Sequence, residues 1–163
     1  MKIASFLLPQ LRKPNIEWCC NRGECFAIGA VPLPEDSPTR SAWLLVAGGL
    51  VRNHSLALIG GGAVKALENH RVDRAFLGTS GITVGHGCST PSAVDAEVKQ
   101  AMVKAAEEVC ILTDSSKFGH NCLVRFASLS EIDLFITDSE LSPMFLNELK
   151  QNAVAIRLAD PIL

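Results

Sequence analysis

Short apolar runs that end in polar or glycine-rich tips constrain this chain more than any other feature of its sequence. The runs are WLLVAGG from Trp43, VDRAFLG from Val72, EVCILTD from Glu108, EIDLFITD from Glu131 and AVAIRLA from Ala153. Segments with helical spacing of apolar residues separate several of them. Strands that alternate with helices favour a parallel sheet with helices on both of its faces. The sequence therefore predicts an α/β fold with a mostly parallel sheet.

The segment SAVDAEVKQAMVKAAEEV, residues 92–109, is the clearest predicted helix. Its apolar residues recur at spacings of three and four and form one stripe of Val94, Val98, Ala101, Met102, Ala105 and Val109. We expect Ser92 to be the N-cap, with Asp95 as the acidic partner of a capping box. Asp95 and Lys99 are one turn apart, which predicts a favourable ion pair.

Two further helices are expected. One begins after the three glycines at 60–62, and the other begins at Ser142-Pro143, where proline suits the first turn of a helix.

The composition is that of a globular protein. The chain has 163 residues, of which 48% are hydrophobic and 20% are charged, so we expect one domain of ordinary size. The net charge of −2 gives no overall basic field that would attract nucleic acid or an anionic membrane.

The cysteines and the longest apolar run bear on localisation. None of the six cysteines forms a C-x-x-C pair, and the start of the chain carries no convincing export signal. The longest apolar run, residues 42–51, is half the length of a membrane span and contains two glycines. The sequence therefore predicts a cytoplasmic protein with reduced thiols and no membrane partner.

Residues 1–42 differ in character from residues 43–163. They are rich in proline and show no sustained helical or strand period, so we treat them as an irregular N-terminal lead-in. The alternatives are a disordered segment or one short hairpin that depends on the rest of the chain. Zinc binding by Cys19, Cys20 and Cys25 is disfavoured, because their spacing is unusual and no histidine is near.

The polar tips of the runs are the best candidates for a ligand site. In open parallel sheets, ligands bind beyond the carboxyl ends of the strands. Hydroxyls, glycine amides and one mobile cation at these tips suit an anion, and the positive end of the helix near Ser92 points to the same rim. The candidate residues are Gly78, Thr79, Ser80, Gly81, Asp95, Lys99, Asp114, Ser115 and Lys117. The alternative is that each serves an ordinary turn or helix start.

Other chemistries are poorly supported by the sequence. No nucleophile has its base at a diagnostic spacing, and Cys88 has only His86 nearby. The glycines at 60–62 and 85–87 do not match a dinucleotide-binding motif. We therefore expect no catalytic residues, no metal and no cofactor.

The motifs VDRAFLGTSGI, DAEVKQAM, LTDSSKFG and IDLFITD, in this order and at this spacing, resemble the effector-sensing domain of the DeoR family of bacterial transcriptional regulators. The segment LLVAGGLVRNHSLALIGGGAVKAL resembles the part that precedes them in that family. The resemblance covers about residues 43–160.

This resemblance implies a sensor domain similar in fold to ribose-5-phosphate isomerases and glucosamine-6-phosphate deaminases. Members of the family typically repress operons for sugar use and release DNA when a phosphorylated sugar binds. The positions that match the family's effector pocket are Gly78, Gly81, Asp95, Lys99, Asp114 and Lys117.

The chain departs from the family pattern in three ways. Residues 1–42 do not resemble a winged helix-turn-helix, and the upstream D-x-G-T-T turn and T-N pair that grip phosphate are absent. Ser80 stands where the family often has an acid or amide, and Asp95 stands where glutamate is usual. The expectation is a sensor domain incomplete at its N-terminal side, as a truncated gene, a frame-shifted gene or a short paralogue would give.

The leading hypothesis is a sugar-phosphate-sensing regulatory domain of a DeoR-type repressor, without enzyme activity and without its own DNA-binding domain. It implies a homo-oligomer that affects DNA only indirectly, through an absent helix-turn-helix or an intact relative. One alternative is a sugar-phosphate isomerase or deaminase, with Asp95 or Asp114 as base and Lys117 holding phosphate. The other is a degenerate remnant that binds nothing.

Overall fold

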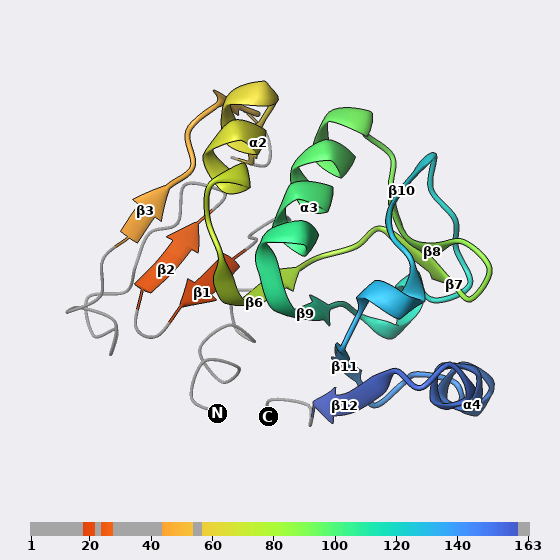
Figure 1. The fold of residues 1–163 in the computed structure, drawn as a ribbon. Coiled ribbons are helices and arrows are strands. Elements are labelled where there is room, and N and C mark those ends of the chain that lie inside the picture. Colours follow the sequence, from red (N-terminus) through yellow and green to blue (C-terminus); the bar gives the residue numbers. More distant parts are fainter. Residues whose placement is uncertain (1–17, 22–23, 28–43, 54–56, 160–163) are drawn as a thin grey trace.

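The main feature of the computed structural model is a large sheet (Figure 1). The structure describes residues 18–21, 24–27, 44–53 and 57–159. Within these residues the sheet has seven strands. Their spatial order is β12 (Ala155–Ala159), β11 (Leu134–Asp138), β9 (Ala106–Leu112), β6 (Val72–Leu77), β1 (Trp18–Asn21), β2 (Glu24–Ala27) and β3 (Leu44–Val46).

The sheet is mostly parallel, as the sequence predicts. Strands β6, β9, β11 and β12 pair in parallel, and β3 pairs in parallel with β2. Among the described strands of this sheet, only β1 runs against its neighbours. The central strands are apolar because side chains on them are fully buried, including Leu77, Ile111 and Phe135, each 0% exposed. The α/β fold class is confirmed.

The described part of the N-terminal region joins this sheet. Strands β1 and β2 form a hairpin, and β1 lies directly beside β6, with Trp18 opposite Phe76. The antiparallel pairing of β1 with β2 fits the short hairpin considered for residues 1–42, and residues 22–23 between these strands lie outside the described part. The other residues of that region lie outside the described part, and the domain boundary at residue 42 stays a prediction.

Helices α2 (Gly61–Glu68) and α3 (Ala93–Ala105) pack against each other over one face of the sheet (Figure 1). Leu67 and Met102, one from each helix, are at most 1% exposed and belong to the hydrophobic core. Helix α4 (Pro143–Gln151) leads into β12 and begins with Pro143 after Ser142, as expected.

Helix α3 is shorter than the sequence predicts. It ends at Ala105, and Ala106 already has extended backbone angles and pairs with Val72 in the sheet. Val109 therefore belongs to β9, and Val94, in the first helical turn, is 40% exposed. The predicted stripe is correct only for Val98, Ala101, Met102 and Ala105. Strand pairing with β6 overrides the helical propensity of the Ala-Glu-Glu segment.

A second, smaller sheet combines two strands that follow β6 in the chain with one strand that follows β9. It has three antiparallel strands among the described residues, β7 (Gly81–Thr83), β8 (Gly87–Thr90) and β10 (Val124–Ala127). All of β8 is buried although it contains no large side chain. The sequence does not predict these strands, because small residues give no alternating pattern even where close packing requires them.

The smallest sheet is a hairpin of two short strands, β4 (Leu50–Val51) and β5 (Leu58–Ile59), which precedes α2. Leu50 and Val51 are 72% and 54% exposed, so β4 contributes little to the core. Arg52 follows β4 at once, and its backbone nitrogen donates to the carbonyl oxygen of Ala57 at 3.0 Å.

Substitution of Gly87 tests the packing of the second sheet. Gly87 has a φ of 83°, and a Cβ atom there would lie 2.2 Å from the carbonyl oxygen of Ala127. We expect Gly87→Ala to lower the free energy of unfolding by about 2–4 kcal/mol, since an unfavourable φ and overpacking each cost on the order of 1–3 kcal/mol. Urea denaturation measures this change.

Gly85→Ala is the matched control in the same turn. No atom lies within 4 Å of the position that its Cβ would take. A large loss of stability in this control, or none in Gly87→Ala, would contradict the explanation by close packing.

Candidate functional site

The ends of the strands form one connected rim. The loop after β9 contains a 3-10 turn, η1 (Ser115–Lys117), whose Ser115 nitrogen donates to Asp138 Oδ2 at 2.8 Å, at the end of β11. Farther along the same loop, the nitrogen of Gly119 donates to the carbonyl oxygen of Ile82 in β7 at 2.8 Å. Backbone donors therefore fix the loop after β9 to the end of β11 and to strand β7, which follows β6 in the chain.

Asp138 has a carboxylate that is held in its charged form. Burial opposes that charge, but hydrogen bonds from Ser115 and from the backbone nitrogen of Glu140 outweigh it and keep the pKa of Asp138 below its ordinary value of 3.8. This residue belongs to a tip that the sequence selects, but it is not among the predicted site residues.

Lys99 lies beneath the rim, not on it. Lys99 is only 8% exposed, and its Nζ donates to the carbonyl oxygen of Gly78 at 2.6 Å. The same ammonium lies 5.1 Å from the centre of the Phe126 ring, a cation–π distance. The structure thus brings together Lys99 and Gly78, two of the predicted site residues.

Asp95 has a partner that the sequence does not reveal. Its Oδ2 accepts from Arg52 Nη1 at 2.6 Å, and Arg52 Nη2 donates to Ser92 Oγ at 2.9 Å. Ser92 is the N-cap of α3, as predicted, and accepts from the nitrogen of Asp95 at 3.3 Å. The predicted capping box is wrong, because the Asp95 carboxylate binds Arg52 instead of returning to the N-cap. The sequence predicts that Asp95 pairs with Lys99. In the structure the Asp95 carboxylate binds Arg52, and Lys99 Nζ donates to the carbonyl oxygen of Gly78.

The loop from Gly78 to Gly81 is tightly fixed by its own bonds. Thr79 Oγ1 donates to the carbonyl oxygens of Gly81 and Ser89 at 2.9 and 3.1 Å. The nitrogen of Ser80 also donates to Ser89, whereas the Ser80 residue itself is exposed. A Cβ atom at Gly81 would lie 2.5 Å from the carbonyl oxygen of His120, so glycine is needed there for packing.

Asp114 and Lys117 lie together on the exposed side of the rim. Asp114 Oδ1 accepts from the nitrogen of Ser116 at 3.0 Å, the local turn bond that the sequence left as an alternative. Lys117 Nζ is 3.8 Å from Asp114 Oδ2, and the two side chains are 40% and 55% exposed. Such a long and exposed ion pair contributes under about 1 kcal/mol, so the ammonium can change partners at little cost.

The thiol of Cys88, in strand β8, is not reactive. Burial raises the pKa of the Cys88 thiol to about 12, in spite of Lys99 and Thr79, which act in the opposite direction. Cys88 is therefore a neutral thiol at pH 7 and not an activated nucleophile.

Metal binding finds no support in the described residues. They contain no group of three or more His, Cys, Asp or Glu side chains that could hold a metal ion. The side chains of Cys19, Cys20 and Cys25 lie outside the described part.

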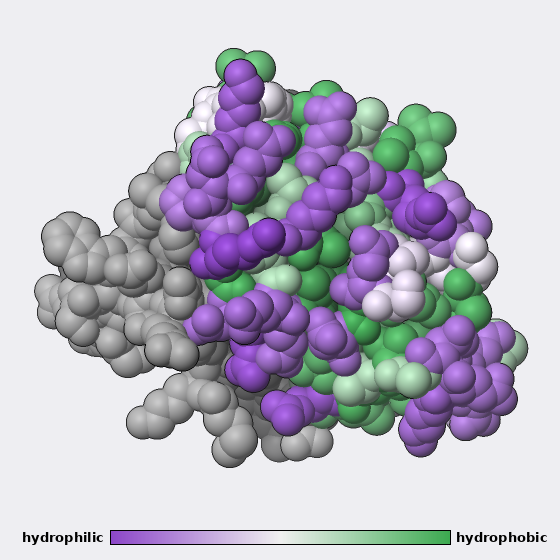
Figure 2. Space-filling model, viewed as in Figure 1, coloured by the Kyte–Doolittle hydropathy of each residue, from purple (hydrophilic) through white to green (hydrophobic). Residues whose placement is uncertain are grey.

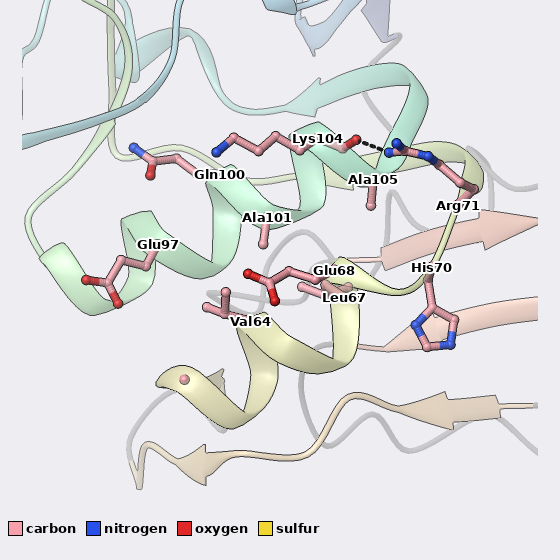
Figure 3. Close-up of a pocket in the computed structure, with 11 residues that line it drawn as sticks. Val64, Leu67, Glu68, His70, Arg71, Glu97, Gln100, Ala101, Lys104 and Ala105 are labelled. Carbon is pink, nitrogen blue, oxygen red and sulfur yellow. Dashed lines mark hydrogen bonds between the residues drawn. The ribbon is translucent and has the colours of Figure 1, made fainter.

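A groove between α2 and α3 lies away from these residues. It has a volume of about 440 Å³ and is lined by Val64, Leu67 and Ala101, with Lys104 and Arg71 beside it (Figure 3). Arg71 Nη1 donates to the carbonyl oxygen of Lys104 at 2.7 Å. Hydrophilic side chains cover most of this face of the molecule, with apolar residues visible between them (Figure 2). None of the predicted site residues lines the groove.

The comparison with known families decides the identity of the fold. Residues 37–139 match the family model described as the DeoR C-terminal sensor domain, which is well over half of the chain. This chain belongs to the DeoR C-terminal sensor-domain family.

The relatives of this DeoR-family domain are transcriptional regulators. The HTH-type transcriptional regulator GlpR of Haloferax volcanii is 39% identical over 109 residues, 67% of this chain and 43% of that protein. The HTH-type transcriptional repressor GlcR of Bacillus subtilis is 34% identical over 116 residues, 71% of this chain and 44% of that protein. The glycerol-3-phosphate regulon repressor of Escherichia coli is 29% identical over 96 residues, 59% of this chain and 38% of that protein.

The chain spans less than half of the length of each of these three relatives. What it shares with them is the DeoR-family sensor domain, an effector-sensing regulatory domain. Within the described residues, no helix combines the length and the apolar character needed to cross a membrane.

The acid stability of this DeoR-family domain tests the role of Asp138. Because its folded pKa is lowered, Asp138 stabilises the fold above its ordinary pKa of 3.8 and loses this effect as the pH falls through the folded value. We expect Asp138→Asn to be less stable than wild type near neutral pH, with the difference shrinking below pH 3.8. Urea unfolding between pH 7 and pH 2.5 measures this.

Glu140→Gln is the control, because it removes a carboxylate from the same tip but keeps the backbone donor to Asp138. A difference between Asp138→Asn and wild type that is independent of pH would rule out a charged Asp138 as the stabilising species.

Proposed function

We propose that this chain is the sugar-phosphate-binding sensor of a DeoR-type repressor of sugar metabolism and that it acts by binding, without chemistry. The observation that carries the proposal is the position of Lys117, a 40% exposed cation at a strand end, next to the hydroxyl groups of Ser115 and Ser116. An anionic ligand needs this combination of donors.

A phosphate group would compete with Asp114 for Lys117. The existing pair is 3.8 Å long and exposed, whereas a phosphate has more charge and more acceptor oxygens. Ligand binding would therefore exchange one weak ion pair for a stronger one.

The sugar would lie along the remaining predicted residues. Ser80 is exposed on the loop whose Gly78 carbonyl binds Lys99, and Asp95 lies at the start of the adjacent helix α3. Hydroxyl groups of a sugar both donate and accept, so they suit a rim that offers serine hydroxyls, backbone amides and a carboxylate. Gly78, Thr79, Gly81 and Ser115 would shape this rim mainly through their backbone.

Regulation would work through linkage. A ligand that prefers one arrangement of the protein shifts the population toward it and so changes the affinity for a second partner. For this domain the second partner would be DNA, reached indirectly through a helix-turn-helix part or an intact relative in a mixed oligomer. The relatives named as regulators and repressors support this, and a cytoplasmic homo-oligomer is the form in which it would operate.

The contacts of the titratable residues favour binding over catalysis. A general base must reach the reacting proton in its basic form. Asp95 is paired with Arg52, Lys99 donates to Gly78, and Cys88 is a neutral thiol. These arrangements support a sensor and give no support to an isomerase or deaminase.

Thermal unfolding with a panel of sugar phosphates and their unphosphorylated parents tests the proposal. At a hundred times its dissociation constant, a ligand adds about 2.7 kcal/mol of stability, a rise of several degrees for a domain of this size. We expect a rise with at least one sugar phosphate and none with its parent sugar, because the phosphate supplies the charge for Lys117.

Lys117→Ala should reduce this rise, and Lys150→Ala, which removes an exposed lysine from the last turn of α4, should leave it unchanged. A flat panel over a cooperative melt would reject a working sensor and favour the degenerate remnant.

A further inference from the structure

Arg52 links two elements that are far apart in the sequence. It follows strand β4, and its guanidinium binds Ser92 and Asp95, 40 and 43 residues later, at the start of α3. The side chain of Arg52 is 35% exposed and that of Asp95 is 16% exposed. Two donors from one planar guanidinium, at 2.6 and 2.9 Å, fix the orientation of the carboxylate and of the N-cap together.

The other oxygen of Asp95 is left without a donor. Asp95 Oδ1 is buried and, among the described residues, has no hydrogen-bond partner. A buried carboxylate oxygen without a donor is costly, and such an atom in a folded protein calls for an explanation by water or by a ligand. Here Arg52 occupies Oδ2 and leaves Oδ1 for another donor.

We propose that Arg52 is a positioning residue of the effector site: it holds Asp95 so that Oδ1 accepts a hydroxyl group of the bound sugar. This rests on the proposed function, since it assumes that the rim binds a sugar phosphate. The inference adds Arg52 to the proposed site. It also assigns the two parts of the ligand to different residues, the phosphate to the surroundings of Lys117 and a sugar hydroxyl to Asp95.

The burial of Oδ1 gives this arrangement a mechanical consequence. A hydroxyl reaches Oδ1 only when the segments around it make room, and Arg52 directly follows strand β4. Its two residues, Leu50 and Val51, are exposed, so few apolar contacts resist a displacement. Binding of the sugar would therefore be accompanied by a shift of β4 and Arg52 relative to α3.

Two probes separate positioning from direct anion binding. The first is the sugar phosphate that gives the largest thermal shift with the wild-type chain, and the second is inorganic phosphate, which has no sugar hydroxyl. In Arg52→Ala, we expect the dissociation constant for the sugar phosphate to rise at least tenfold, while that for inorganic phosphate changes less than twofold. Titrations followed by amide chemical shifts measure both constants.

Two further variants keep the test decisive if Arg52→Ala does not fold. Asp95→Asn has the size of the natural side chain but lacks the charge that binds Arg52. It should weaken sugar-phosphate binding about as much as Arg52→Ala does, while leaving inorganic phosphate binding nearly unchanged. Arg52→Lys keeps one charge but loses the two-donor geometry, so it should give an intermediate loss. If both single variants fold, the double variant Arg52→Ala/Asp95→Asn should bind no more weakly than the weaker single variant, because the two residues act as one unit.

Each other result overturns the proposal. Equal weakening of both probes would make Arg52 a direct ligand of the phosphate. Unchanged binding of both would make the Arg52–Asp95 pair purely structural. If the wild-type chain binds no sugar phosphate in the panel, the proposed function itself fails and this inference fails with it.

Discussion

The bond between Lys99 and Gly78 is the constraint on which the arrangement of the rim depends. Lys99 belongs to α3, Gly78 follows β6 of the large sheet, and the Phe126 ring under the ammonium belongs to β10 of the second sheet. One buried cation therefore contacts all three. Removing an ammonium from water is costly unless it gains strong partners. The carbonyl and the aromatic face offset this cost only while the three elements keep their present positions.

The other rim contacts have a similar character, because they join loops instead of extending one element. Ser115 is held by Asp138, Gly119 is bonded to Ile82, and Arg52 reaches across to Asp95. The rim is therefore held in place by bonds that come from other strands and from helix α3.

The sequence predicts the elements of this fold better than the contacts of its site. Strand β6, the start of α3 and the proline start of α4 follow from periodicity and capping signals that act over a few residues. Strands β7 and β8 escape prediction because glycine and serine carry no alternating pattern, although packing at Gly87 requires them. The partners of Lys99 and Asp95 could not be predicted for another reason. A spacing of four on a helix gives no information about a carbonyl or an arginine more than 20 residues away in the sequence.

The buried thiol of Cys88 gives the molecule a built-in reporter of its own opening. Cys88 is 0% exposed and belongs to β8, in the sheet that carries Phe126, whereas Cys122 is only partly buried. A neutral and shielded thiol reacts with an alkylating reagent only during excursions that separate the rim from the core. The alkylation rate of Cys88 would therefore report how often those excursions occur, without a label engineered into the chain.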